Sequence, residues 1–142
     1  MPRTNWVRLV IGILIGTVIM FFSDGFFHER VVGNDWVAVY TTLGISPPVR
    51  NVANLWYFVV FEMGRAIIAM ALYVLMRRCC NPGPMTAALA GVVMWLAFSV
   101  TGPAQFIPLG FYSHALWVKV AAFQFVTSII ATVAGAAVYK ES

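Results

Sequence analysis

Four apolar segments constrain this chain more than any other feature of its sequence. They cover residues 6–27, 55–76, 85–101 and 115–139. A helix needs about 20 predominantly apolar residues to cross the hydrocarbon core of a bilayer. Ser, Thr and Gly recur in these segments without the two-residue alternation of barrel strands, so each segment is predicted to be a helix. The sequence therefore predicts an all-α fold, an integral membrane four-helix bundle.

The composition agrees with a domain that lies mostly in lipid. Of the 142 residues, 61% are hydrophobic and 10% are charged, whereas soluble domains carry about 25% charged residues. This length predicts a single transmembrane domain, residues 1–142. The net charge is +4, but the basic residues lie at the ends of apolar segments and form no patch that would follow phosphates. We expect the lipid bilayer, and no nucleic acid, as a partner.

Lys and Arg residues beside the segments predict the orientation, because cytoplasmic flanks are rich in them. If both termini are cytoplasmic, five basic residues flank that side and two flank the other. The five are Arg3, Arg8, Arg77, Arg78 and Lys140, and the two are Arg30 and Arg50. The first segment lacks a small-x-small cleavage site, which favours a retained signal anchor over a cleaved signal peptide. Both termini are predicted to be cytoplasmic.

The connections between the segments differ in kind. The turn RRCCNPGP, residues 77–84, is short, so the second and third helices should be antiparallel neighbours. In the first outer loop, residues 34–45 predict a short helix, capped by Asn34 or Asp35, that lies on the outer interface. Gly102 and Pro103 are expected to end the third helix. Lipidation of the adjacent thiols in the 77–84 turn is an alternative to the simpler reading of two unpaired cysteines.

Glu62 and Arg65 lie in the middle of the second apolar segment. An Arg or Asp at a span centre opposes insertion by about 2.5–3.5 kcal/mol, while a Leu, Ile, Phe or Val returns only about 0.3–0.6 kcal/mol. If glutamate costs the same, the two charges oppose insertion by roughly 5–7 kcal/mol, and ten apolar residues return roughly 3–6 kcal/mol. This helix therefore needs neighbours. The two residues are three apart, so they share a face and can pair.

Polar residues in the other segments are expected at a similar depth. Asp24 and Glu62 balance Arg65 and Lys119 in charge, so we expect these side chains to face inward and neutralise one another. The full predicted network, or alternatively a substrate or ion site, consists of Asp24, His28, Glu62, Arg65, His114, Lys119 and Gln124. As a structural network it would hold the bundle together. As a functional one it would bind a substrate or carry protons.

Small residues recur at helical spacing on two segments. One stripe runs through Gly12, Gly16, Met20, Asp24 and His28, and the other through Lys119, Phe123, Thr127, Ala131 and Gly135. Small residues let helices in a membrane approach closely. Both stripes are small toward the cytoplasmic end and polar toward the outer end. They predict close packing at the inner end and a polar crevice that faces the outer side.

Few residues in the sequence are candidates for catalysis or for binding a metal or cofactor. His28 and Asp24 make at most half of a metal site, and His114 is the only other imidazole, so no metal site is predicted. No Ser or Cys nucleophile stands with a base in a catalytic motif. Neither histidine is deep in a helix, as a haem ligand would be. We expect no catalytic residue and no cofactor, and the chain is predicted not to be an enzyme.

Two stretches carry a resemblance to a known set of proteins. They are RRCCNPGPMTAALAGVVMW, residues 77–95, and the ending GAAVYKE, residues 135–141. A basic Gly-Pro turn before a small-residue helix, and a closing run of small residues, Tyr, a basic residue and Glu, resemble uncharacterised small bacterial four-helix membrane proteins. The resemblance implies a protein of the bacterial inner membrane. It supplies no activity.

Two functions remain open from the sequence, with a third more distant. The leading hypothesis is a non-catalytic subunit or scaffold of a membrane assembly, which associates with itself or with a larger complex. The alternative is a small homo-oligomeric transporter or channel in which Glu62 and Asp24 bind a cation or a proton. A membrane-embedded enzyme that acts on lipids is the third.

Overall fold

The computed structural model describes residues 4–48 and 51–139, and every regular element in them is helical. Arg3, Arg50 and Lys140, used above for orientation, and Glu141 of the C-terminal motif lie outside these residues. Four helices are long and apolar enough to cross a membrane: Trp6–Val31, Val52–Met76, Pro84–Ala104 and His114–Val138. The predicted all-α fold is confirmed for the described residues, and its four long apolar helices are compatible with the predicted membrane bundle.

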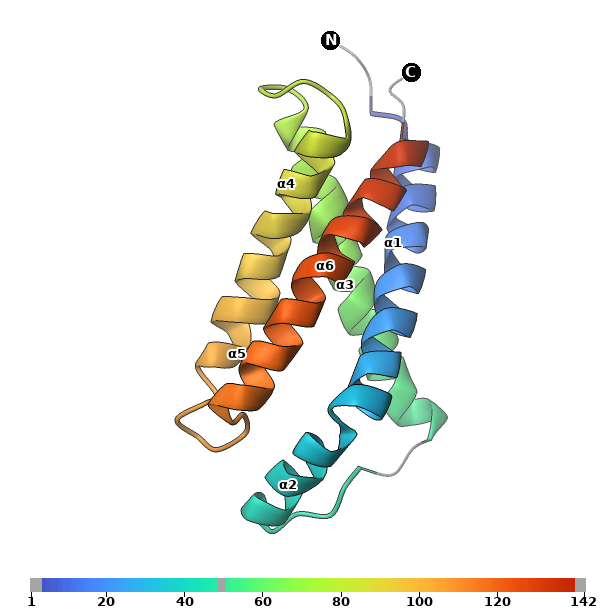
Figure 1. Cartoon of the computed structure of the whole chain (residues 1–142). Coiled ribbons are helices and arrows are strands. Elements are labelled where there is room, and N and C mark those ends of the chain that lie inside the picture. Colours follow the sequence, from blue (N-terminus) through green and yellow to red (C-terminus); the bar gives the residue numbers. More distant parts are fainter. Residues whose placement is uncertain (1–3, 49–50, 140–142) are drawn as a thin grey trace.

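The last helix occupies the centre of the bundle. In chain order the elements are α1 (Trp6–Phe26), the π-helix η1 (Phe27–Val31), α2 (Gly33–Leu43), α3 (Val52–Met76), α4 (Pro84–Trp95), the π-helix η2 (Leu96–Thr101), α5 (Gly102–Ala104) and α6 (His114–Val138). Figure 1 shows α6 between α1 and α4, with α3 behind it. The helix α6 contacts α1, α3 and α4, so any group buried on α6 faces several neighbours.

Polar caps fix where three long helices begin. Asn5 and Asn51 accept hydrogen bonds from the backbone N–H groups of Arg8 (3.2 Å) and Asn54 (2.8 Å), and Ser113 accepts one from Leu116 (3.1 Å). Each cap satisfies a backbone donor that has no partner within its helix. The Asn51 cap starts α3 at Val52, three residues before the predicted start at residue 55.

Both π-helical segments extend a membrane span beyond its predicted end. The segment η1 continues α1 past residue 27, and η2 with α5 continues the third span to Ala104. Gly102 and Pro103 therefore do not end this helix, contrary to the prediction. The Gly102 N–H bonds to the Ala97 carbonyl, five residues back. Pro103 then falls in the first turn of α5, where a missing N–H is tolerated.

The helix α2 lies beyond the end of the bundle where α6 begins (Figure 1). It starts at Gly33 without a side-chain cap, so the prediction of a cap at Asn34 or Asp35 is wrong. It ends at Gly44, whose φ of 65° suits the left-handed C-cap that glycine adopts readily. Its residue Val39 packs in a cluster of buried side chains with Phe27, Val32, Leu116 and Val120.

The helices α1 and α6 cross through backbone contact between two glycines. A Cβ atom added to Gly12 would lie 2.6 Å from the Gly135 carbonyl oxygen, and one added to Gly135 would lie 2.6 Å from the Gly12 oxygen. On α4, a Cβ at Gly91 would lie 2.9 Å from the Ser128 oxygen. The close packing predicted from the small residues is therefore present, and it occurs within one chain.

An aromatic clamp joins the ends of α3 and α6. The guanidinium carbon of Arg77 lies 5.5 Å from the ring centre of Tyr73 and 5.0 Å from that of Tyr139. The two rings meet edge to face, 6.2 Å apart. Both tyrosines share a buried cluster with Leu9 and Ala136, so α1 begins at the same end of the bundle where α3 and α6 finish. We call this the inner end and the opposite one the outer end.

The glycine crossing predicts how two identical substitutions differ. Gly135→Ala should destabilise the protein by about 1–3 kcal/mol, because the new methyl group meets backbone that cannot rotate away. Gly64→Ala is the matched control, since no atom lies within 4 Å of its added Cβ, and it should be neutral or stabilising by up to about 1 kcal/mol. Reversible unfolding in mixed micelles measures both changes. Equal effects of the two substitutions would contradict the observed crossing.

Candidate functional site

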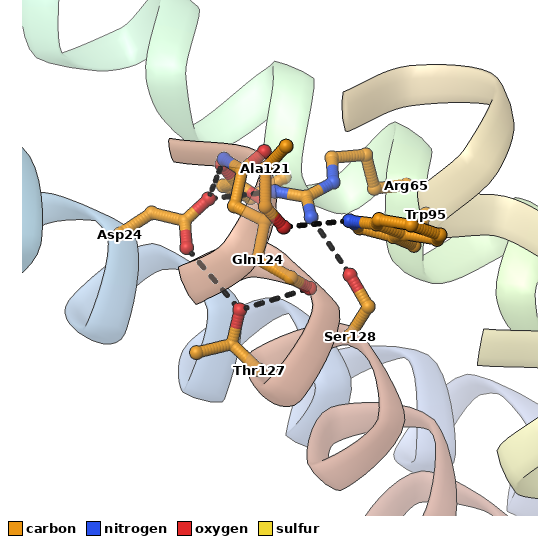
Figure 2. Close-up of polar contacts among 8 residues, drawn as sticks. Asp24, Arg65, Trp95, Ala121, Gln124, Thr127 and Ser128 are labelled. Carbon is orange, nitrogen blue, oxygen red and sulfur yellow. Dashed lines mark hydrogen bonds and ion pairs between the residues drawn. The ribbon is translucent and has the colours of Figure 1, made fainter. Parts of the chain in front are cut away.

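Arg65 of α3 holds two carboxylates with one nitrogen. Its Nη1 lies 2.7 Å from Oδ2 of Asp24 on α1 and 2.8 Å from Oε2 of Glu62 on α3, while Nη2 donates to Oγ of Ser128 on α6 at 3.1 Å. Figure 2 shows the guanidinium between Asp24 and Ser128. The Arg65 side chain is fully buried, and both carboxylate side chains are only 6% exposed. We refer to Asp24, Glu62 and Arg65 as the buried triad.

The central helix α6 surrounds Asp24 with further polar groups. Gln124 Nε2 donates to Asp24 Oδ2 at 2.5 Å, and Thr127 Oγ1 donates to Asp24 Oδ1 at 3.5 Å (Figure 2). Gln124 was predicted for the network, but Thr127 and Ser128 were not. They stand three and four residues after Gln124, and this helical spacing puts all three on one face. The helical spacing from Gln124 is therefore the sequence signal that could have identified Thr127 and Ser128.

His28 lies one helical turn beyond Asp24 and is bonded to a tryptophan. Its Nδ1 is 2.8 Å from Nε1 of Trp36 on α2. An indole N–H can only donate, so Nδ1 accepts and carries no proton, and the imidazole is neutral. His28 therefore adds no positive charge to the buried triad.

Lys119 is not part of the network, contrary to the prediction. Its Nζ lies 2.8 Å from Oδ2 of Asp35 on α2, and the two side chains are 51% and 33% exposed. Lys119 precedes Gln124 by five residues, which is about 7.5 Å along a helix toward the outer end. Because α2 packs near this end of α6 through Val39, Asp35 is within reach of Lys119, whereas the buried carboxylates lie deeper in the bundle.

His114 also lies apart from the buried triad. It is the first residue of α6 and is exposed, so the prediction that it joins the network is wrong. Across residues 4–48 and 51–139, no group of three or more His, Cys, Asp or Glu side chains could hold a metal ion.

The two cysteines follow α3 as exposed thiols. The sulfur atoms of Cys79 and Cys80 are 3.9 Å apart. Their hydrogen bond raises the pKa of the Cys80 thiol above its ordinary value. A raised pKa lowers the thiolate fraction at neutral pH and with it the reactivity of the sulfur.

Without Lys119, the buried charges do not cancel. Two acids face one base, so the expected balance of two acids against two bases is wrong. Within the part of the chain that the structure describes, the Nε atom of Arg65 has no hydrogen-bond partner. The triad is therefore an ion cluster with an excess acid.

Two apolar grooves open at the outer end and meet at shared residues. One, of about 370 Å³, runs between Phe61 and the η2–α5 segment, and the other, of about 340 Å³, runs along α2. Both are lined by Phe106 and Tyr112. Burial raises the pKa of the Tyr112 phenol, and the neighbouring Tyr40 adds to this effect, so the phenol is neutral at physiological pH. These grooves are not the predicted polar crevice between the outer ends of the first and last spans, because their walls are mainly apolar and neither helix lines them.

One aromatic ring lies between the first groove and the triad. Phe61 lines this groove, and its ring centre is 5.8 Å from the guanidinium carbon of Arg65. It also meets Phe98 of η2 edge to face, at 6.4 Å. The Phe61 ring is therefore in contact with both the groove and the guanidinium of the triad.

Comparisons with protein-family models, with curated proteins and with solved structures found no match. The resemblance to small bacterial membrane proteins therefore stays a prediction.

The geometry predicts that removing the charge of Arg65 destabilises the protein more than removing the charge of Lys119. Arg65→Met leaves two buried carboxyl groups without their cation and should destabilise the protein by about 3–5 kcal/mol. Lys119→Met breaks an exposed ion pair and should cost about 0–1 kcal/mol. Unfolding in mixed micelles measures both. A loss of similar size for the two variants would show that burial of the triad does not determine its contribution.

Proposed function

We propose that this protein is a non-catalytic subunit or scaffold of a membrane assembly. The observation that carries the proposal lies in the outer half of α3, whose first two turns are mostly exposed. Four consecutive residues, Leu55, Trp56, Tyr57 and Phe58, are each at least half exposed. Successive helical residues are about 100° apart, so these four cover the whole circumference of the helix. This segment has room for a neighbouring helix on several sides.

The proposed partner-binding surface consists of bulky aromatic side chains and not of the small-residue faces that the sequence suggested. The small-residue faces, which suggested association between chains, are used inside this chain, where Gly12 meets Gly135 and Gly91 meets α6. Association must then use bulky side chains. Aromatic residues are enriched at the centres of protein interfaces, and the outer half of α3 supplies Trp56, Tyr57 and Phe58.

A non-catalytic role agrees with the surroundings of the two histidines. The Nδ1 atom of His28 is occupied by the Trp36 indole, and His114 is exposed at the start of α6. General base catalysis needs an available nitrogen within hydrogen-bond reach of the group it deprotonates.

The proposed setting is the bacterial inner membrane, with the inner end of the bundle in the cytoplasm. Arg8, Arg77 and Arg78 lie at that end, and Arg30 lies at the other. An excess of basic residues on the cytoplasmic side supports this orientation. The helix α2 would then lie at the outer interface, where its residues Trp36 and Tyr40 suit the boundary between lipid and water.

Site-specific photo-crosslinking tests the proposal. A photoreactive phenylalanine analogue replaces Tyr57, which is 73% exposed on α3, or Phe26, which is 64% exposed on α1. In native membranes the Tyr57 position should give a discrete protein adduct, several-fold more abundant than any from the Phe26 position. Mass spectrometry identifies the adduct as a second copy or another protein, and native mass spectrometry in nanodiscs checks that the same partner co-purifies.

Two results would contradict the assembly proposal. One is a monomer in nanodiscs with equal, lipid-only adducts at both positions. The other is ion-dependent flux by the purified chain in liposomes that Glu62→Gln abolishes while the fold stays intact, which would support the transporter alternative. Under the assembly proposal, the purified wild-type chain should conduct no such flux.

A further inference from the structure

The buried triad contains two acidic groups and one basic group, and the proposed assembly role does not explain this imbalance. Asp24 and Glu62 each carry a negative charge when ionised, and within residues 4–48 and 51–139 Arg65 carries the only positive charge in contact with them. Burying one uncompensated charge is strongly unfavourable even after the surroundings relax. A buried group in this position commonly avoids the cost by binding a proton and becoming neutral.

In the part of the chain that the structure describes, the neighbouring helices supply no second cation to the triad. From α6 the groups that face the triad are Gln124, Thr127 and Ser128, none of which titrates near neutral pH. Beyond Asp24, the imidazole of His28 is neutral because it accepts from Trp36. The outer basic residue of α6, Lys119, is paired with Asp35.

The two carboxylates are placed to share a proton. Their oxygens lie 2.7 and 2.8 Å from the same atom, Nη1 of Arg65, so two negative charges face each other across one nitrogen. Carboxylates that share a site in this way do not readily ionise together. Independently, the buried Nε–H of Arg65 has no acceptor among the described residues, so the guanidinium has unused capacity to bind a polar ligand.

Hydrogen bonds decide which carboxyl group keeps the proton. Among the described residues, Asp24 accepts from Arg65, Gln124 and Thr127, whereas Glu62 accepts from Arg65 alone. Donors that point at a carboxylate stabilise its charged form. These contacts favour the charged form of Asp24 over that of Glu62.

We propose that the Asp24–Glu62–Arg65 triad is a proton-binding site, occupied by one proton on Glu62 and reached from the outer-end groove beside Phe61. In the resting state the triad is neutral, with Asp24 as carboxylate, Arg65 as guanidinium and Glu62 as carboxylic acid. Release transfers the Glu62 proton to water in the groove and leaves the triad with one negative charge. This inference stands independently of the assembly proposal.

Infrared spectroscopy in nanodiscs tests the site directly, because a protonated carboxyl group has its own C=O stretching band. The chain has five Asp and Glu residues, so the band can be assigned by substitution. At neutral pH the wild-type protein should show one protonated carboxyl band, which shifts in D₂O if the site exchanges with solvent. The band should be lost in Glu62→Gln and retained in Asp35→Asn, the matched acid in an exposed ion pair.

A further variant separates charge imbalance from simple burial. In Asp24→Asn the triad has one acid and one base, so Glu62 should ionise and the band should disappear although Glu62 is still present. If the band survives in Asp24→Asn, the apolar surroundings alone protonate Glu62 and the charge argument is wrong. Absence of the band from the wild-type protein at neutral pH overturns the proposal whether or not the variants fold.

Discussion

The guanidinium of Arg65 is the group on which the arrangement of the bundle depends. Alone, α3 would bring both Glu62 and Arg65 into lipid, at a cost that its apolar residues barely offset. In the bundle, Arg65 contacts Asp24 on α1 and Ser128 on α6 as well as its own helix neighbour. Removing a single partner from such a buried cluster leaves a charge without compensation. The polar contacts therefore fix which faces of three helices meet.

This cluster and the glycine crossing depend on each other. Gly12 and Gly135 let the backbones of α1 and α6 touch near the inner end. Three turns farther along α1, Asp24 meets Gln124 and Thr127 of α6. Small residues thus set the distance between these two helices, and polar residues set their rotation and depth. Packing and hydrogen bonds replace the hydrophobic effect as the source of specificity, since lipid is as apolar as the helix surfaces.

Segment length and hydropathy were enough to predict the four helices, because the bilayer thickness constrains both. Helical spacing also predicted that Glu62 and Arg65 pair, and that Asp24 and Gln124 lie near them. The error at Lys119 has a different origin. Its partner Asp35 lies on α2, and the direction in which that helix folds depends on the π-helix η1 and on Phe27, which stacks on Phe123 of α6 at 4.1 Å. No local pattern in the first outer loop predicts this contact. The count of buried charges was wrong for the same reason.

A double-mutant cycle between Asp24 and Arg65 tests the central claim most directly, that these two side chains form a buried pair joining α1 to α3. The single variants Asp24→Asn and Arg65→Met and their combination are compared by unfolding in mixed micelles. The account predicts strong non-additivity, with a coupling free energy of about 1–3 kcal/mol, as found for residues in direct contact. Additive effects, within about 0.5 kcal/mol, would contradict it.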